Sequence, residues 1–350
     1  MPAEPCPPDS ASRQALTRFL LAAFQLPPGT PFVSPDLLRW KYDDPRPDFT
    51  GPRSYVWKDK AGEIAAHACL FPVTYGLPAG DIRASYLIDW GALRNSPGAG
   101  VALLRLLAGH FDVLLAIGGS PDTVSILPKL GYRRAGELHL FARVLRPWRQ
   151  FRTDPFPRGW KAPARLARNM LRSRAPLPAS PAEWSAQPIV SFDMACQALF
   201  EARVHSPFPA TRRTPGLMNY MLACPGAAYS AALLRRGGEL RGWFVVSRAG
   251  RQARVADLWL DSHLVDDWTA GYWLALRTAS QDPVACEVIA SGSIPIAIEA
   301  AAAAGFRPHH IEPIFALDPK ILLPSTPAFN VAFLESDLAY HENPAYPYLT

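Results

Sequence analysis

The chain has 350 residues, of which 49% are hydrophobic and 19% are charged. This composition excludes a chain that is disordered throughout and suits two domains of about 150 to 200 residues each. Residues 1–12 lack the basic start and apolar core of a secretory signal, and no run of about 20 apolar residues occurs, so we expect a cytoplasmic protein without a transmembrane helix. Five widely separated cysteines with no CxxC pair predict buried, reduced thiols and no metal site.

The formal net charge of +6 at pH 7 is concentrated in residues 146–174. This segment holds nine Lys and Arg residues and a single acid, Asp154, so the remainder of the chain sums to about −2. Its many prolines predict a linker over 148–182, with a short helix near 164–172. A solvated connector is one interpretation, and a surface for anionic lipid or for a phosphorylated substrate is the other. Nucleic acid is not the expected partner, because the segment does not predict an aromatic platform on which single-stranded bases would stack.

The first half predicts antiparallel strands early and a strand-helix-strand crossover in its middle, which together make a mixed sheet. In chain order we expect helices near 12–24 and 35–42, a two-stranded hairpin over 54–67, a strand over 87–93, a helix over 101–108, a buried strand over 112–117, a helix over 120–130 and a closing strand after Gly131.

The second half repeats this order of elements. Each half has a hairpin turn at a glycine, Gly62 or Gly238, and later a Gly-aromatic-Arg turn, at Gly131 or Gly305. The two turns are 69 residues apart in the first half and 67 in the second. Such matched order and spacing indicate an internal repeat.

A strand with an acid and a Trp lies between those turns in both halves, as Tyr86-Leu-Ile-Asp-Trp and as Val255-Ala-Asp-Leu-Trp. We therefore predict an α/β (α+β) protein of two tandem mixed-sheet domains, residues 1–147 and 183–350, joined by the linker.

A glycine-containing turn, Asn95-Ser96-Pro97-Gly98-Ala99-Gly100, follows the strand over 87–93 and leads into a helix at Val101. Glycines let the backbone take positive φ and approach a ligand closely. Unpaired N–H groups at the helix start, with the helix dipole, bind anions. The turn therefore predicts a phosphate cradle built from Asn95, Gly98, Ala99, Gly100 and Val101.

This turn, together with the order of elements, resembles the GNAT superfamily of acyl-CoA-dependent N-acyltransferases, whose signature is Gln/Arg-x-x-Gly-x-Gly/Ala. Asn95 stands at the first position, which is a departure from the family. The resemblance implies acetyl-CoA as the acyl donor, with its pyrophosphate at the turn and its pantetheine arm on backbone groups of Ala92 and Leu93. It also places Ser120 where the family often has Asn. Leu127 stands where the family often has a Tyr that acts as general acid, so that role has no candidate.

The second half departs further from the family pattern. Asp266 and Asp267 stand where a pyrophosphate would lie and would repel it, and Ala301 takes the place of the Tyr. We predict that only the first half binds CoA, and that the second is a degenerate GNAT-like domain that shapes the acceptor site.

Two candidates arise for the catalytic base. Asp89 is flanked by Ile88 and Trp90, and burial there would raise its pKa towards neutral. A structural role is the alternative, because Asp257 occupies the matching place in the second half. The aromatic, Pro-rich chain end over 343–350 is expected to be docked. Some tandem GNAT enzymes use the C-terminal carboxylate, here that of Thr350, as base, and simple packing is the alternative.

The function that we expect is N-acyl transfer from acetyl-CoA to an amine acceptor, a small molecule or glycan such as an amino sugar. Trp40 and Tyr42 could stack on a sugar and Asp43 and Asp44 hold an ammonium, although an amphipathic helix end explains them equally. One alternative is an aminoacyl-tRNA-dependent transferase with paired GNAT-like domains, in which the basic linker contacts RNA. The other is a non-catalytic binding or scaffold protein.

Overall fold

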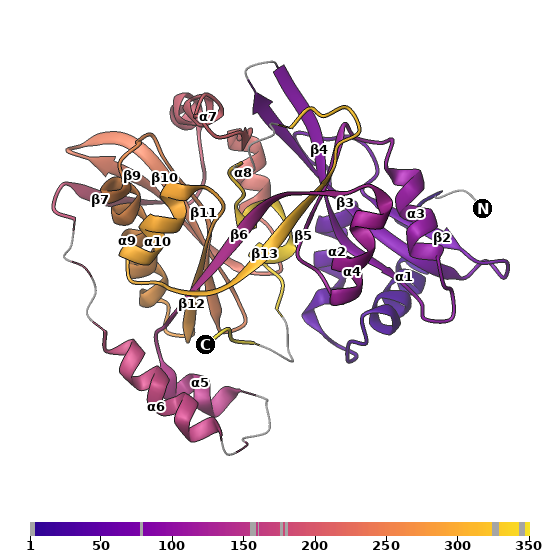
Figure 1. The fold of residues 1–350 in the computed structure, drawn as a ribbon, viewed down its shortest axis with the longest axis horizontal. Coiled ribbons are helices and arrows are strands. Elements are labelled where there is room, and N and C mark those ends of the chain that lie inside the picture. The colour runs from indigo at the N-terminus through magenta and orange to yellow at the C-terminus, as the bar shows by residue number, and fades with distance from the viewer. Residues whose placement is uncertain are drawn as a thin grey trace. The chain divides into compact units, whose positions relative to one another are not determined.

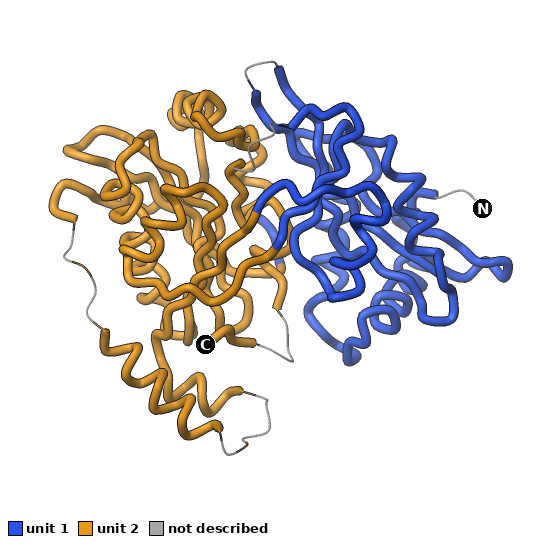
Figure 2. Tube along the Cα trace, viewed as in Figure 1, with its two compact units in different colours: residues 1–136, 223–225, 313–327 blue, residues 137–222, 226–312, 328–350 orange. Residues whose placement is uncertain are grey.

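The computed structural model describes residues 4–77, 80–154, 159, 161–175, 178, 181–323, 329–342 and 347–350. The chain forms two compact units (Figure 2). Unit 1 comprises residues 1–136, 223–225 and 313–327, and unit 2 comprises 137–222, 226–312 and 328–350. The chain passes from one unit to the other inside strands β6 (Arg133–Val144) and β13 (Arg307–Leu317) (Figure 1).

Unit 1 is built on strands in the order β1-β2-β3-β4-β5-β13. The first four pair antiparallel, β4 and β5 pair parallel, and residues 314–317 of β13 pair antiparallel with β5. The elements that belong to this unit are β1 (Glu4–Pro5), α1 (Ser10–Ala23), η1 (Pro31–Val33), α2 (Pro35–Tyr42), β2 (Ser54–Lys58), β3 (Ile64–Leu77), β4 (Gly80–Ala92), α3 (Ala99–Leu107), β5 (Val113–Ile117), α4 (Pro121–Ile126) and η2 (Leu127–Leu130).

Helix α3 connects β4 to β5 and supplies much of the core of unit 1. Its residues Leu103, Leu104 and Leu107 recur at helical spacing and are buried against Leu70 and Leu114 of the sheet. Each buried leucine contributes about 1.5 to 3 kcal/mol, which anchors the helix and so fixes where its N-terminus lies.

Unit 2 has strands in the order β6-β12-β11-β10-β9-β7, in which β11 and β12 pair parallel. Helices α9 and α10 pack on β10, β11 and β12. Its elements are α5 (Pro147–Thr153), α6 (Lys161–Ser173), β7 (Trp184–Ile189), η3 (Met194–Cys196), α7 (Gln197–Val204), β8 (Ala210–Thr211), α8 (Pro215–Leu222), β9 (Ala228–Arg236), β10 (Glu239–Ala249), β11 (Gln252–Leu260), α9 (Val265–Gln281), β12 (Glu287–Gly292), α10 (Pro295–Ala303), η4 (Phe333–Glu335) and η5 (Asp337–Ala339).

The internal repeat is visible in the order of elements. The series α1-α2-β2-β3-β4-α3-β5-α4-β6 is followed by the series α7-α8-β9-β10-β11-α9-β12-α10-β13, which has the same sequence of helices and strands. The prediction of a mixed-sheet α/β protein with two similar halves is confirmed.

The segment predicted as a linker contains two helices, α5 and α6, which pack on one another within unit 2 (Figure 1). The helix expected near 164–172 is the central part of α6. Residues 155–158, 160, 176, 177, 179 and 180 of this segment lie outside the described residues.

The other global expectations concern cysteines and membrane spans. All five cysteines are buried, as predicted, and none of them lies in a disulfide. Within the described ranges, every helix is too short or too polar to cross a bilayer.

Candidate functional site

The site predicted at the glycine-containing turn begins with a separation of two strands in unit 1. Strands β4 and β5 run parallel, but they pair only from Ala84 to Tyr86 of β4, opposite Val113 to Leu115 of β5. β4 continues to Ala92, so its last six residues extend beyond that ladder. An unpaired strand edge presents N–H and C=O groups to any extended chain that lies along it.

The opposite edge of β4 is paired with β3 as far as Ala92, with a register shift between His67 and Cys69 of β3. Asp89 lies at this irregularity with φ of 50°, a left-handed conformation that non-glycine residues seldom adopt. A bulge of this kind bends a strand and re-aims its side chains and backbone groups. It lies within the six residues that extend beyond β5.

Helix α3 is the next element after this strand and follows the turn over residues 93–98. Gly98 is its N-cap with φ of 83° and has no side chain with which to cap the helix. Its first turn, Ala99-Gly100-Val101, contains no acid, and the N–H groups of Gly100 and Val101 precede the first intrahelical bond, from Ala102 N–H to Gly98 C=O. This helix start has the features of an anion site.

Trp90 links the strand to the turn. Its indole Nε1–H donates a hydrogen bond of 3.0 Å to the carbonyl of Gly100, which is buried. The freed edge of β4 and the start of α3 are therefore held together by a side chain that the sequence analysis noted only as part of the repeat and as a neighbour of Asp89, not as a site residue. The signal that could have identified Trp90 was its place two residues before the end of β4, close in sequence to the glycine-containing turn.

Other predicted cofactor residues have defined partners. Leu93 donates its N–H to Ala65 C=O at 2.9 Å, and its C=O accepts from Ser96 N–H at 3.0 Å. Both backbone groups of Leu93 are therefore engaged, and the backbone groups that could pair with a ligand belong to the residues of β4 that precede Leu93. Asn95 is exposed. Ser120 is the N-cap of α4, where its Oγ accepts from the N–H of Thr123 at 3.2 Å.

Asp89 is buried in an ion pair. Its Oδ2 lies 2.9 Å from Lys41 Nζ and accepts a hydrogen bond of 2.7 Å from the hydroxyl of Tyr42. Burial by itself would raise the pKa of Asp89, but the Lys41 ammonium and these two hydrogen bonds outweigh it, and the pKa lies below its ordinary value. The expectation of a raised pKa was wrong, because it considered the strand neighbours and not the cation on α2.

A signal for Lys41 was present in the sequence. It follows Leu37 and Leu38 at helical spacing and so lies on the buried face of α2, where a charge needs a partner. His67 completes the cluster: Nδ1 contacts the Asp89 carbonyl and Nε2 contacts Ser54 Oγ, each at 3.0 Å. Burial lowers the pKa of His67 to about 4, so its ring is neutral at pH 7.

The candidate acceptor residues on α2 are engaged in the fold of unit 1. Trp40 and Tyr42 are buried. Asp43 forms an ion pair with Arg13, and Asp44 lies 3.6 Å from Arg39. These contacts are typical of the end of an amphipathic helix, which was the alternative to a role of these residues in binding the acceptor.

In the corresponding region of unit 2, another segment of the chain narrows the space between the strands to a small recess. β11 and β12 also pair over only three positions, from Gln252 to Arg254, and then separate. The backbone N–H of Val331 donates to Ser293 Oγ at 2.7 Å, so the chain near residue 331 lies against the end of β12. Asp267, in the first turn of α9, accepts from Ser262 Oγ at 2.6 Å.

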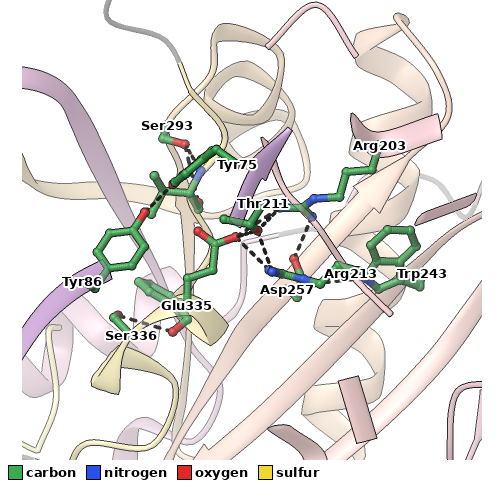
Figure 3. A network of polar contacts seen from close by, with 12 residues as sticks. Tyr75, Tyr86, Arg203, Thr211, Arg213, Trp243, Asp257, Ser293, Glu335 and Ser336 are labelled. Carbon is green, nitrogen blue, oxygen red and sulfur yellow. Dashed lines mark hydrogen bonds and ion pairs between the residues drawn. The ribbon is translucent and has the colours of Figure 1, made fainter. Parts of the chain in front are cut away.

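Asp257 of β11, the counterpart of Asp89, also has buried cationic partners (Figure 3). Arg203 and Arg213 approach it at 3.3 and 3.2 Å, and Glu335 lies 2.8 Å from Arg213. The two arginines and the two carboxylates together have no net charge, which lowers the free-energy cost of burying them. In both halves, therefore, the acid of this strand is paired with a cation from the region of the preceding helices.

Thr350 is docked within unit 2, whereas residues 343–346 of the aromatic chain end lie outside the described residues. Its backbone oxygen accepts hydrogen bonds from Arg165 Nε at 2.8 Å and from Gln150 Nε2 at 3.2 Å. Its backbone N–H donates to Glu287 at 2.9 Å. Packing accounts for these contacts, and the role of Thr350 as base stays a prediction.

The sequence matches no family model, and it matches no curated protein. Solved structures do match. The chain is similar to a GCN5-related N-acetyltransferase from Anabaena variabilis, with TM-score 0.56, 10% identity and coverage of 90% of this chain and 72% of that chain. It is also similar to N-myristoyltransferase from Saccharomyces cerevisiae with bound myristoyl-CoA, with TM-score 0.60, 11% identity and coverage of 90% and 82%.

A third similar structure is a probable N-acyltransferase from Enterococcus faecalis, with TM-score 0.54, 10% identity and coverage of 90% of this chain and 71% of that chain. The chain therefore has a GNAT fold, in a form with two similar halves. Identities at this level speak for the fold alone.

Proposed function

We propose that the protein is an acyl-CoA-dependent N-acyltransferase whose first half binds the acyl donor. The observation that carries the proposal is the separation of β4 from β5 after Tyr86, combined with the start of the next helix, α3, which has two glycines and no acid. The fold supports it, because the similar structures include an N-acetyltransferase and an N-myristoyltransferase that was solved with its acyl-CoA.

The residues of this half suit the two ends of CoA. The pantetheine arm is an extended chain with amide groups, which match the backbone N–H and C=O groups of residues 87–92 as a further strand would. The pyrophosphate is an anion, which matches the N–H groups of Gly100 and Val101 and the dipole of α3. We propose acetyl-CoA as the donor and a small-molecule or glycan amine, such as an amino sugar, as the acceptor.

In this reaction the amine attacks the thioester carbonyl, the C–N bond forms as the C–S bond breaks, and the proton lost by the amine ends on the released thiol. An oxyanion at the carbonyl needs N–H donors, and the freed edge of β4 provides them. Asp89, within this stretch, is our candidate for the proton acceptor, with the Thr350 carboxylate as alternative. Because its pKa is low, Asp89 is a weak base, and transfer requires an amine that arrives mostly neutral.

The proposal is tested by isothermal titration calorimetry with acetyl-CoA and with a long-chain acyl-CoA. Gly98→Glu places a carboxylate at the start of α3 and should weaken binding at least tenfold, or about 1.4 kcal/mol. Gly62→Glu is the matched control, because both glycines have φ near 85° and open space where a Cβ would lie.

Absence of binding by the wild-type protein at millimolar acyl-CoA would overturn the proposal and favour a non-catalytic binding protein. Unchanged binding by Gly98→Glu would remove the donor from the start of α3. If binding holds, release of free thiol with a panel of amines identifies the acceptor.

A further inference from the structure

Unit 2 contains two adjoining recesses that are lined by arginines. One holds Arg143 of β6, Arg172 of α6 and Arg307 of β13 around a space of about 360 Å³, including its open mouth. The other holds Arg165 and Arg168 of α6 around a space of about 510 Å³, again including its open mouth. Both reach Thr350. We call these five arginines and the space between them the arginine groove.

Local structure and tertiary structure both contribute to the groove. Arg165, Arg168 and Arg172 are spaced three and four residues apart, which places them on one face of α6. Arg143 and Arg307 come from strands that are distant in the sequence. Arg143 is buried and fixed by hydrogen bonds to the carbonyls of Gly305 at 2.8 Å and Ala175 at 2.7 Å.

The acids around the groove do not balance its arginines. Asp154 lies 2.5 Å from Arg165, and the C-terminal carboxylate belongs to Thr350. Glu287 lies behind Thr350 and is bonded to its N–H. Five guanidinium groups thus face three carboxylates, which leaves an excess of two positive charges. The C-terminal carboxylate alone does not account for a groove of this charge.

The arginines also repel one another. Burial, and then the charge of Arg307, lower the pKa of Arg143. Burial, and then Arg172 and Arg165, lower the pKa of Arg168. Cations held this close together are relieved by an anion that bridges them.

Phosphate is the anion that best suits this arrangement. Guanidinium groups bind its oxygens in pairs of parallel hydrogen bonds, and a phosphate offers enough acceptors for several arginines at once. Exposed apolar side chains lie on the same pair of helices, with Leu171 72% and Trp148 58% exposed. A basic face beside exposed apolar groups is typical of contact with anionic lipid.

We propose that the arginine groove binds a phosphate group, carried either by the headgroup of an anionic phospholipid or by a soluble phosphorylated molecule. The site is distinct from the start of α3 and does not depend on the proposed acyl transfer.

Two binding experiments distinguish the two sources. Sedimentation with vesicles of phosphatidylglycerol and phosphatidylcholine, against phosphatidylcholine alone, tests the lipid source. Calorimetry with inorganic pyrophosphate, carried out also on Gly98→Glu so that binding at the start of α3 does not contribute, tests the soluble source. We expect binding in at least one, weakened at least tenfold in Arg172→Ala/Arg307→Ala. Neither side chain is buried, so the variant should fold.

The matched control is Arg18→Ala/Arg105→Ala, which removes two exposed arginines of unit 1 and should bind as the wild type does. Gly98→Glu should also bind normally, which separates this proposal from the acyl-CoA site. The proposal is overturned if the wild type binds neither probe, if the groove variant binds as well as the wild type, or if only single-stranded RNA binds.

Discussion

Lys41 Nζ lies 2.9 Å from Asp89 Oδ2, and both side chains are almost completely removed from solvent. The pair joins helix α2 to the part of β4 that extends beyond β5, across 48 residues of sequence. A buried carboxylate without its cation is costly, so this contact links the stability of unit 1 to the geometry of the proposed donor site.

Replacing Lys41 should therefore destabilise the protein. Lys41→Met leaves the Asp89 carboxylate buried with the hydroxyl of Tyr42 but without its ammonium partner, and we expect a loss of about 3 to 5 kcal/mol in the free energy of unfolding. Urea denaturation measures it. The control, Lys60→Met at an exposed lysine, should change stability by less than about 0.5 kcal/mol. A loss below about 1 kcal/mol for Lys41→Met would contradict the importance of the pair.

His67 should make stability depend on pH. Its pKa is lowered from 6.5 to about 4 in the folded state, so between these values the unfolded chain binds the proton more readily. Stability should therefore fall as the pH drops from about 6.5 towards 4, by at most about 1.4 kcal/mol per pH unit from this group.

The comparison that isolates His67 is the wild type against His67→Gln, by urea denaturation from pH 7.5 to pH 4.5. The difference between the two free energies should shrink as the pH falls, because the variant has no ring to protonate. Two parallel curves would show that His67 does not titrate in this range.

Asp89 should leave a specific signature in the kinetics if it accepts the proton. Because its pKa lies below its ordinary value, the carboxylate stays ionised above about pH 5, and kcat/KM should rise with pH as the amine loses its proton. Asp89→Asn should lower kcat by a factor of about 100 while acyl-CoA still binds.

The measurement is the pH profile of acyl transfer, with calorimetry to confirm donor binding by each variant. An acidic limb near pH 6 to 7 that Asp89→Asn abolishes would mean that the pKa is raised after all. An unchanged kcat in Asp89→Asn would move the role of base to Thr350 or to water. Adding one residue after Thr350 displaces its carboxylate and tests that alternative.

Trp90 should position the start of α3. Trp90→Phe keeps an aromatic ring but removes the Nε1–H bond to the Gly100 carbonyl, worth about 1 kcal/mol, so donor affinity should fall about fivefold. Trp57→Phe is the control, because Trp57 packs against the same hydrophobic core as Trp90. Equal losses of affinity in the two variants would show general loosening of the core instead of a positioning effect.

The repeat and the glycine-containing turn were predictable because their signals are local. Periodicity, turn residues and the glycines at 98 and 100 depend on neighbours a few positions apart, so element order and the start of α3 followed from the sequence. The stripe of arginines on α6 is equally local.

Contacts between distant segments were decided only by the tertiary structure. The direction of the pKa shift of Asp89 depends on Lys41, and the partners of Thr350 include Gln150, which is 200 residues away. The separation of β4 from β5 depends on where their ladder stops, and the charge of the arginine groove depends on two strands that meet α6. Composition and spacing do not determine which charged groups become neighbours, because tertiary packing decides this. At short distances in a buried site, a neighbouring charge changes a pKa more than the adjacent residues in the sequence do.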